Sequence, residues 1–463
     1  MQTHSWKGRR VTVMGLGLFG GGAAAARYLA RAGAKVTITD TRNAQDLAAA
    51  IAMLDGLPME LRLGGHAAEH FDGAEAVVVN PAVDPKNAWV QYARQRGSLI
   101  TSETALFLER CQARVYCVTG TQGKSSTSTM LHQLLAAGFG RAHLGGNIGR
   151  SLVESAEGMH EDERVVLELS SYQLEHLPQQ LAHLGTPPRV EAVTCVNVLP
   201  DHLDRHGSLE AYGQAKEHIL DLVDATGGWA VLPAEDPITR GWTRPHAKRI
   251  DAWFETSTER GLNLRGGEFR LDSEVLGRVD DLRLPGVFQR KNALIALGMA
   301  RLAGVAPATL AATIPSLTAP SHRLEDLGSC GGHRVWDNGV STTPDSTLSV
   351  LDSVQAPICL LMGGKSKGLP WGELVAKART TRVARVYAFG HAGREIAQAF
   401  EGSGIACSPC ATVREAVELA YAHMQPGEDL LFSPACASYD AYKNFQERAL
   451  DFRAALPAND CPA

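Results

Sequence analysis

The residues best suited to chemistry in this sequence form one short loop: Gly120, Thr121, Gln122, Gly123, Lys124, Ser125 and Ser126. An apolar, β-branched run precedes the loop, and a helix-compatible segment follows it. In such a loop the glycines let backbone N–H groups converge on phosphate oxygens, the lysine neutralises charge, and a serine hydroxyl can reach Mg²⁺. Only two residues separate Gly120 from the Gly123-Lys124 pair, where the usual phosphate loop has four. We interpret the segment as a shortened phosphate loop; the alternative is an ordinary strand-to-helix turn.

Charged side chains follow the next two predicted strands, residues 164–169 and 192–198. Glu168 lies inside the apolar run Val-Leu-Glu-Leu, where a carboxylate is costly to bury unless it is paired or binds a metal. The second strand is followed by a dense set of acids and histidines: Asp201, His202, Asp204 and His206. We expect all these groups at one ligand-binding mouth, because parallel strands end at the same edge of a sheet. The alternatives are a structural ion pair for the glutamate and helix caps within the cluster.

A second glycine-rich turn lies near the N-terminus. Gly15, Gly17 and Gly20 follow the apolar run 11–14 with GxGxxG spacing, and Asp40 ends the next predicted strand about 20 residues on. This pattern predicts a helix N-terminus able to hold a diphosphate and a carboxylate placed for a ribose or base. NAD or FAD would fit, as would any other nucleoside diphosphate, and a purely structural turn is the remaining alternative.

Strand and helix patterns alternate along the chain, which is typical of α/β domains with parallel sheets. We predict three such domains: residues 1–109, 110–317 and 318–463. In the last domain, apolar runs predict further parallel strands at residues 358–362, 383–389 and 429–432.

Two other polar residues lie on predicted helices. Lys216 sits beside the apolar face of the helical segment 209–223, where a lysine is normally solvated or extends to solvent. Asn292 precedes a strong helical pattern, and taken alone it could be an N-terminal helix cap.

The composition excludes several classes of function. The 463 residues include 44% hydrophobic and 21% charged residues, as in ordinary globular enzymes. A net charge of −5 gives no electrostatic basis for binding nucleic acid or an anionic membrane. No stretch approaches the roughly 20 apolar residues that cross a bilayer, so we expect no membrane insertion. Nine scattered cysteines, of which Cys407-Ser-Pro-Cys410 form the closest pair, predict reduced thiols in a cytoplasmic protein.

Taken in order along nearly the whole chain, the motifs resemble those of the Mur ligases. The matching motifs are Gly120-Thr-Gln-Gly-Lys-Ser, Glu168-Leu-Ser-Ser-Tyr-Gln, Asn197 with Asp201-His-Leu-Asp-Arg-His-Gly, Tyr212 with Lys216, His322-Arg-Leu-Glu, and Ser433-Pro-Ala-Cys-Ala-Ser with Lys443-Asn-Phe. The resemblance implies a three-domain α/β architecture: a Rossmann-like UDP-binding domain, a central P-loop ATPase domain and a C-terminal Rossmann-like domain that binds glutamate.

The resemblance also implies a reaction. The enzyme would be an ATP-dependent amide ligase that adds D-glutamate to UDP-N-acetylmuramoyl-L-alanine through an acyl phosphate, in cytoplasmic peptidoglycan precursor synthesis. Its partners would be these small molecules and ATP, and we expect a monomer. Its cofactors would be two Mg²⁺ ions and a carbamate formed on Lys216 from CO₂.

Residue roles follow from the matched motifs. The implied catalytic residues are Lys124, Glu168, His202 and Lys216. The implied metal ligands are Ser125, Glu168, His202 and the carbamate of Lys216. ATP would contact the loop residues 120–126, and in addition Asn292 and Arg323. The UDP substrate would contact Gly15, Leu16, Phe19, Asp40, Thr41, Arg42, Asn147, Ser170 and Gln173. Glutamate would contact Thr342, Lys367, Ser438 and Phe445.

The sequence departs from the family pattern in three places, one of which is Asn80-Pro81-Ala82, where Ser-Pro-Gly is usual. Gln122 and Ser126 keep the polar character of the phosphate loop, so we still expect ATP binding. Asn338 and Val340 stand where the family commonly has an aspartate and a lysine, which leaves the glutamate enantiomer open. The alternatives are an L-glutamate-adding relative, a folylpolyglutamate-synthase-like ligase, an NAD(P)-dependent oxidoreductase and a non-catalytic nucleotide sensor. The oxidoreductase would leave the phosphate loop and its charged neighbours without a role.

Overall fold

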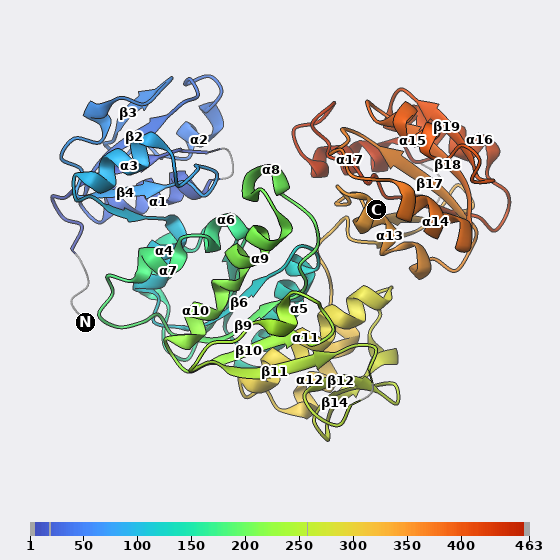
Figure 1. Ribbon diagram of the computed structural model, residues 1–463, viewed down its shortest axis with the longest axis horizontal. Coiled ribbons are helices and arrows are strands. Elements are labelled where there is room, and N and C mark those ends of the chain that lie inside the picture. Colours follow the sequence, from blue (N-terminus) through green and yellow to red (C-terminus); the bar gives the residue numbers. More distant parts are fainter. Residues whose placement is uncertain (1–4, 18–19, 257, 458–463) are drawn as a thin grey trace. The chain divides into compact units, whose positions relative to one another are not determined.

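A computed structural model describes residues 5–17, 20–256 and 258–457 (Figure 1). The chain divides into two compact units: Met1–Leu282 with Asn292–Leu317, and Arg283–Lys291 with Thr318–Ala463. The first unit holds two separate β-sheets and the second unit holds one. The predicted domain boundaries at residues 109/110 and 317/318 stay predictions.

The N-terminal sheet of the first unit is wholly parallel, with the strand order β3-β2-β1-β4-β5. Its strands are β1 (Arg10–Met14), β2 (Lys35–Asp40), β3 (Glu60–Leu63), β4 (Ala76–Val79) and β5 (Leu99–Thr101). The chain runs outward from β1 to β3 on one side and then adds β4 and β5 on the other. In such sheets, ligands bind at the carboxyl ends of the strands where the strand order reverses, which here is between β1 and β4. The predicted glycine turn and Asp40 therefore share one edge of the sheet.

The central sheet of the first unit has nine strands, in the order β14-β13-β12-β11-β10-β9-β6-β8-β7. The strands are β6 (Arg114–Thr119), β7 (Ala142–Gly146), β8 (Arg164–Glu168), β9 (Val190–Cys195), β10 (Trp229–Pro233), β11 (Lys248–Trp253), β12 (Leu262–Arg265), β13 (Glu268–Leu271) and β14 (Glu274–Arg278). The strands from β7 to β12 are parallel, and β13 and β14 add an antiparallel edge. Because β6 lies between β8 and β9, the phosphate loop and the charged cluster meet at the same edge.

Helices cover the strands of the first unit (Figure 1). They are α1 (Gly21–Arg31), α2 (Ala48–Ala52), α3 (Ala88–Gln95), α4 (Glu103–Arg110), α5 (Lys124–Phe139), α6 (Ser171–Leu174), α7 (Leu177–Leu181), α8 (Leu203–His206), α9 (Leu209–Glu217), α10 (Ile219–Asp224), α11 (Val287–Leu302), which spans the boundary between the units, and α12 (Pro307–Thr313). The helix predicted over residues 209–223 is broken at His218 into α9 and α10. Asn292 lies inside α11, so the prediction of a helix cap at that residue is wrong.

The sheet of the second unit has the order β15-β16-β20-β17-β18-β19. Its strands are β15 (Glu325–Cys330), β16 (His333–Asp337), β17 (Ile358–Gly363), β18 (Val383–Phe389), β19 (Ala406–Cys410) and β20 (Asp429–Phe432). Only β15 is antiparallel to its neighbour. The helices are α13 (Pro344–Leu348), α14 (Gly372–Thr380), α15 (Gly393–Ala399), α16 (Val413–His423) and α17 (Phe445–Ala455). The three predicted parallel strands are confirmed as β17, β18 and β20.

Apolar burial follows the strands. The central strands β6, β8, β9 and β17 are almost wholly buried, as near-continuous apolar runs in parallel sheets should be. Among the described residues, seven cysteines are free thiols, which agrees with the prediction of reduced cysteines, but Cys330 is disulfide-bonded, so the prediction is wrong there. In the part of the chain that the structure describes, no helix is both long and apolar enough to cross a lipid bilayer.

Candidate active site

The predicted phosphate loop lies between β6 and α5, with Lys124 as the first residue of the helix. Gly123 has a left-handed backbone with φ of +78°, and a Cβ atom there would collide with Oδ1 of Asn292. Only glycine therefore fits, and the buried Asn292 closes one side of the loop. The N-terminus of a 16-residue helix carries a partial positive charge and free N–H groups, which favour a bound phosphate.

Asn197 holds the phosphate loop in shape. Its Oδ1 atom accepts hydrogen bonds from the backbone N–H groups of Thr121 (3.2 Å) and Gln122 (2.9 Å), and its Nδ2 donates to the carbonyl of Gln122 (3.2 Å). The residue follows β9, the strand beside β6. Sequence reasoning placed Asn197 within a motif but gave it no role. Asn197, like Glu168, is a polar residue within an apolar run, which marked it as a candidate, but nothing local indicated its contact with the loop.

Two lysines converge on the first residue of the loop. Nζ of Lys124 donates to the carbonyls of Gly120 (2.9 Å) and Thr121 (2.8 Å), and Nζ of Lys216 donates to Gly120 at 2.7 Å. Lys216 is only 1% exposed, and its ammonium lies over the ring of Tyr212. Burial, and then the positive charge of Lys124, lower the pKa of Lys216 to about 7. The expectation of a solvated lysine on α9 is therefore wrong, and a large neutral fraction is present near pH 7.

Glu168 ends β8 and is 2% exposed. Its Oε1 atom accepts a hydrogen bond from Nδ2 of Asn147 (2.9 Å), another predicted site residue. Its Oε2 atom is buried and has no hydrogen-bond partner in the described part of the chain. A buried carboxylate oxygen without a partner is costly, and a hard cation that prefers oxygen ligands would satisfy it. The residues present therefore fit Mg²⁺ at this position.

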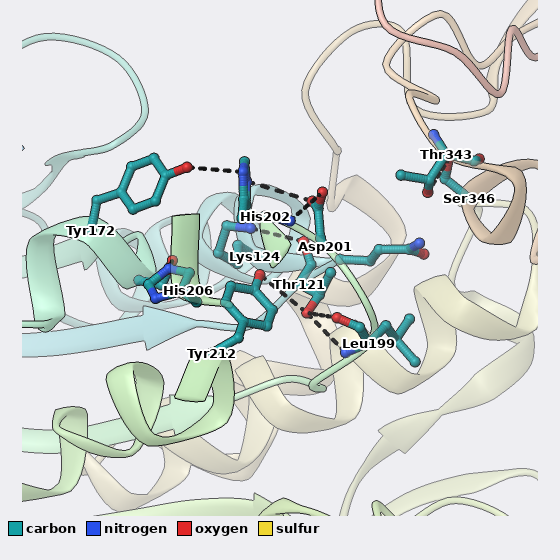
Figure 2. A network of polar contacts seen from close by, with 12 residues as sticks. Thr121, Lys124, Tyr172, Leu199, Asp201, His202, His206, Tyr212, Thr343 and Ser346 are labelled. Carbon is teal, nitrogen blue, oxygen red and sulfur yellow. Dashed lines mark hydrogen bonds and ion pairs between the residues drawn. The ribbon is translucent and has the colours of Figure 1, made fainter. Parts of the chain in front are cut away.

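His202 lies at the start of α8 with a left-handed backbone, φ of +53°. Its Nδ1 is 3.1 Å from the hydroxyl of Tyr172, and its Nε2 is 3.5 Å from Oδ2 of Asp201. Figure 2 shows the Tyr172 hydroxyl directed at the imidazole. The ring of Tyr172 also stacks on His206, whose Nε2 lies 3.1 Å from the hydroxyl of Ser171. Burial lowers the pKa of His206, so this imidazole favours its neutral form.

Tyr212 connects the histidines to the phosphate loop. Its ring lies 5.2 Å from that of His206 and 4.5 Å from Nζ of Lys216, and its hydroxyl is 3.3 Å from Oγ1 of Thr121 (Figure 2). That threonine hydroxyl in turn donates to the carbonyl of Leu199. The residues predicted from three separate motifs thus form one network of contacts in the first unit.

The N-terminal glycine turn is closed by Asp40. Its Oδ2 atom accepts hydrogen bonds from the backbone N–H groups of Leu16 (2.9 Å) and Gly17 (3.4 Å), and its Oδ1 from that of Arg42 (2.9 Å). Asp40 therefore shapes the loop by binding its backbone. The predicted residues Gly15, Leu16, Asp40, Thr41 and Arg42 lie together at the ends of β1 and β2. Phe19 lies outside the described residues.

Ser170 and Gln173 form a capping box at α6. The Ser170 hydroxyl accepts from the backbone N–H of Gln173 (3.3 Å), and Oε1 of Gln173 accepts from the backbone N–H of Ser170 (2.9 Å). Nε2 of Gln173 donates to Oγ1 of Thr104 (3.1 Å). The pair follows Glu168 by two residues, so the cap fixes the polypeptide next to that carboxylate.

The candidate glutamate residues belong to the second unit. They lie in the turns after the adjacent strands β16, β17 and β20 and at the start of α17: Thr342, Lys367, Ser438 and Phe445. Arg323, the candidate ATP contact, precedes β15 in the same unit. The roles assigned to these five residues stay predictions, as do those of the site residues in the first unit.

A buried arginine ties these turns together. Nη1 of Arg448 donates to the carbonyls of Cys436 (2.8 Å) and Gly363 (3.2 Å), and its Nη2 donates to those of Gly339 (3.2 Å) and Ser341 (3.3 Å). Burial lowers the pKa of this fully buried guanidinium to about 10. Its role was invisible in the sequence because the four carbonyls come from segments up to 109 residues away.

Two other polar features of this unit are structural. His322, Glu325 and Asp337 lie close enough together to hold a metal ion, but Arg453 donates to Asp337 (2.7 Å) and Glu325 (2.6 Å) and supplies the positive charge itself. Asn338, one of the departures from the family pattern, is buried and donates to the hydroxyl of Ser433 (3.0 Å). It joins the turns after β16 and β20.

Comparison with known proteins agrees with this geometry. Residues 9–102 match the MurD-like N-terminal domain of Mur ligases, and residues 118–300 match the Mur ligase middle domain. The chain belongs to the Mur ligase family.

Relatives that share one enzyme name match nearly the full length of this chain. The chain is 32% identical to a UDP-N-acetylmuramoylalanine–D-glutamate ligase from Symbiobacterium thermophilum, over 97% of this chain and 98% of the relative. It is 34% identical to the ligase of that name from Roseiflexus sp. (strain RS-1), over 96% and 98%. Both the resemblance drawn from the motifs and the α/β Mur ligase architecture are confirmed.

Solved structures share the fold. The chain superposes on UDP-N-acetylmuramate-alanine ligase from Thermotoga maritima with a TM-score of 0.61 at 18% identity, covering 96% of this chain and 98% of that one. It superposes on MurF from Acinetobacter baumannii with a TM-score of 0.61 at 14% identity, covering 96% and 93%.

Proposed function

We propose that this protein is an ATP-dependent ligase that joins D-glutamate to the L-alanyl carboxylate of UDP-N-acetylmuramoyl-L-alanine during peptidoglycan precursor synthesis. The observation that carries the proposal is the nearly full-length similarity to D-glutamate ligases at 32–34% identity. The phosphate loop, the buried Glu168 and the N-terminal glycine turn support the proposal, because they would bind the phosphates of ATP, a cation and the diphosphate of the substrate.

The first step is attack of the alanyl carboxylate on the γ-phosphoryl group of ATP, which gives an acyl phosphate and ADP. Lys124 and the N-terminus of α5 offset the repulsion between two anions, which is the main electrostatic obstacle to this step. Mg²⁺ held by Ser125, Glu168 and His202 would supply further charge neutralisation. Asn197 would hold the backbone of the loop in shape for the phosphates, since it binds the N–H groups of Thr121 and Gln122.

The second step is attack of the glutamate amine on the acyl phosphate carbonyl, with phosphate as the leaving group and loss of one proton from the nitrogen. Thr342, Lys367, Ser438 and Phe445 would hold the amino acid. A lysine and two hydroxyls suit its carboxylates, since both groups donate hydrogen bonds. Arg323 and Asn292 would contact the nucleotide.

We also propose that Lys216 carries a carbamate. Only a neutral amine reacts with CO₂; the nitrogen forms a bond to carbon and loses a proton to solvent. The lowered pKa of Lys216, about 7, favours that reaction, and its position next to Gly120 brings the new carboxylate to the phosphate loop. The carbamate would add an oxygen ligand for a cation near Glu168.

Two further properties belong to the proposal. We propose that the protein is cytoplasmic, where its nucleotide substrates are made, and that it acts as a monomer. Sedimentation of the purified protein would test the second point, since a dimer would double the apparent mass.

The decisive experiment measures phosphate release from ATP by the purified protein. Release should require UDP-N-acetylmuramoyl-L-alanine, Mg²⁺ and D-glutamate together. The departures at Asn338 and Val340 keep an L-glutamate-adding ligase as the second candidate, so the same assay is run with L-glutamate. A preference for the L-enantiomer would replace the proposal by that candidate, and no turnover with either amino acid would reject both.

A further inference from the structure

The turn that follows β17 is held rigidly where it begins. Arg448 binds the carbonyl of Gly363, and the backbone N–H of Gly364 donates to the carbonyl of Phe389 (3.1 Å). Lys365 and Ala437 then exchange two backbone hydrogen bonds, of 2.8 and 3.0 Å. The first residues of the turn are thereby fixed to the neighbouring strand and to the turn after β20. Lys367 lies two residues further on and is exposed.

A single carboxylate oxygen holds the rest of the turn. Oε1 of Glu395, on α15, accepts hydrogen bonds from the hydroxyl of Ser366 (3.1 Å) and from Nε1 of Trp371 (2.7 Å). The Ser366 hydroxyl also accepts from the backbone N–H of Gly368 (3.1 Å). Trp371 is 8% exposed and packs in the core of the second unit, so it is a firm anchor. The two partners of Glu395 lie on either side of Lys367 in the sequence.

We infer that Glu395 is a positioning residue for substrate binding, because it fixes the turn that presents the Lys367 ammonium to a carboxylate of the incoming amino acid. This inference rests on the proposed function, in which Lys367 contacts glutamate. Without Glu395 the turn would be ordered only on binding, and the lost conformational entropy would weaken affinity. The effect should be specific to the amino acid, since both hydrogen bonds that the Glu395 carboxylate accepts within the described part of the chain come from this turn.

The test compares two substitutions of Glu395 by steady-state kinetics. Glu395→Ala removes both hydrogen bonds and should raise the KM for glutamate roughly tenfold. The KM values for ATP and UDP-N-acetylmuramoyl-L-alanine should stay within about twofold of wild type. Glu395→Gln keeps an acceptor oxygen and should retain most of the affinity for glutamate. Glu401→Ala removes another exposed glutamate just after α15 and serves as the matched control.

A double-mutant cycle separates this role from a general structural one. If Glu395 acts through Lys367, Glu395→Ala should add nothing to the KM increase caused by Lys367→Ala. Additive effects, an equal rise in the KM for ATP, or an unchanged KM for glutamate would each overturn the inference. Should Glu395→Ala fold poorly, Ser366→Ala removes one of the two bonds and should raise the glutamate KM by a smaller factor. The ligase proposal fails separately, through absence of substrate-dependent phosphate release in the wild type.

Discussion

Nζ of Lys216 lies 2.7 Å from the carbonyl oxygen of Gly120, the first residue of the phosphate loop. Lys124 donates to the same oxygen from inside the loop. Burial, and then the positive charge of Lys124, lower the pKa of Lys216 to about 7, so both the charged and the neutral amine are populated near pH 7. The fold thus places a reactive amine next to the site where ATP would bind.

Lys216→Ala should lose roughly 10²-fold or more of the ligase activity, because the proposed carbamate oxygens are removed. Short carboxylates such as acetate or propionate should restore part of the activity, since the cavity left by the side chain can admit them. Phosphate release at saturating substrates measures both effects. A fully active variant would show that the carbamate has no role.

The same lysine should make stability depend on pH. Its pKa is about 7 in the folded protein and near 10.5 when exposed, so the unfolded chain binds more protons between these values. Stability should therefore rise with pH across that window, by up to about 1.4 kcal/mol per pH unit. The measurement is the free energy of unfolding of wild type minus that of Lys216→Met, from pH 7 to 9 in CO₂-free buffer. A constant difference would contradict the prediction.

Glu168→Gln should separate stability from metal binding. The metal-free variant should be at least as stable as wild type, because a buried amide costs less than a buried carboxylate oxygen without a partner. The rise in Tm that Mg²⁺ and a non-hydrolysable ATP analogue cause in the wild type should be lost.

A second buried glutamate, at the other end of β8, provides the control. Glu163 precedes β8 and is bound by Arg141 (3.1 Å) and His143 (2.8 Å). Glu163→Gln should therefore lower the Tm while preserving the response to Mg²⁺ and nucleotide. If both variants respond to Mg²⁺ as the wild type does, Glu168 is not a ligand.

Asn197→Ala should raise the KM for ATP by roughly tenfold or more, because three hydrogen bonds that shape the phosphate loop are lost. The KM for UDP-N-acetylmuramoyl-L-alanine should change little. Asn43→Ala, at an exposed turn of the N-terminal sheet, should leave both constants unchanged. An unaltered KM for ATP in Asn197→Ala would mean that the phosphate loop keeps its shape without the side chain of Asn197.

Contacts between near neighbours in the chain were predictable. The phosphate loop between β6 and α5, and the glycine turn between β1 and α1, are built by consecutive residues whose backbone preferences act locally. Glu168 could also be singled out, since a carboxylate in an apolar strand demands a partner. The family follows from several such motifs in their order, which explains why the sequence was sufficient for it.

Contacts between residues far apart in the chain depend on the strand order of the sheets. Asn197 reaches the phosphate loop because β9 pairs with β6, and Lys216 reaches Gly120 across 96 residues. Neither contact has a local signal, and the charge state of Lys216 depends on burial that only the packed chain creates. The amphipathic pattern of α9 even suggested a solvated lysine. By itself the sequence determined which residues could do chemistry, while the tertiary structure decided which of them meet, because pairing and burial join residues far apart in the chain.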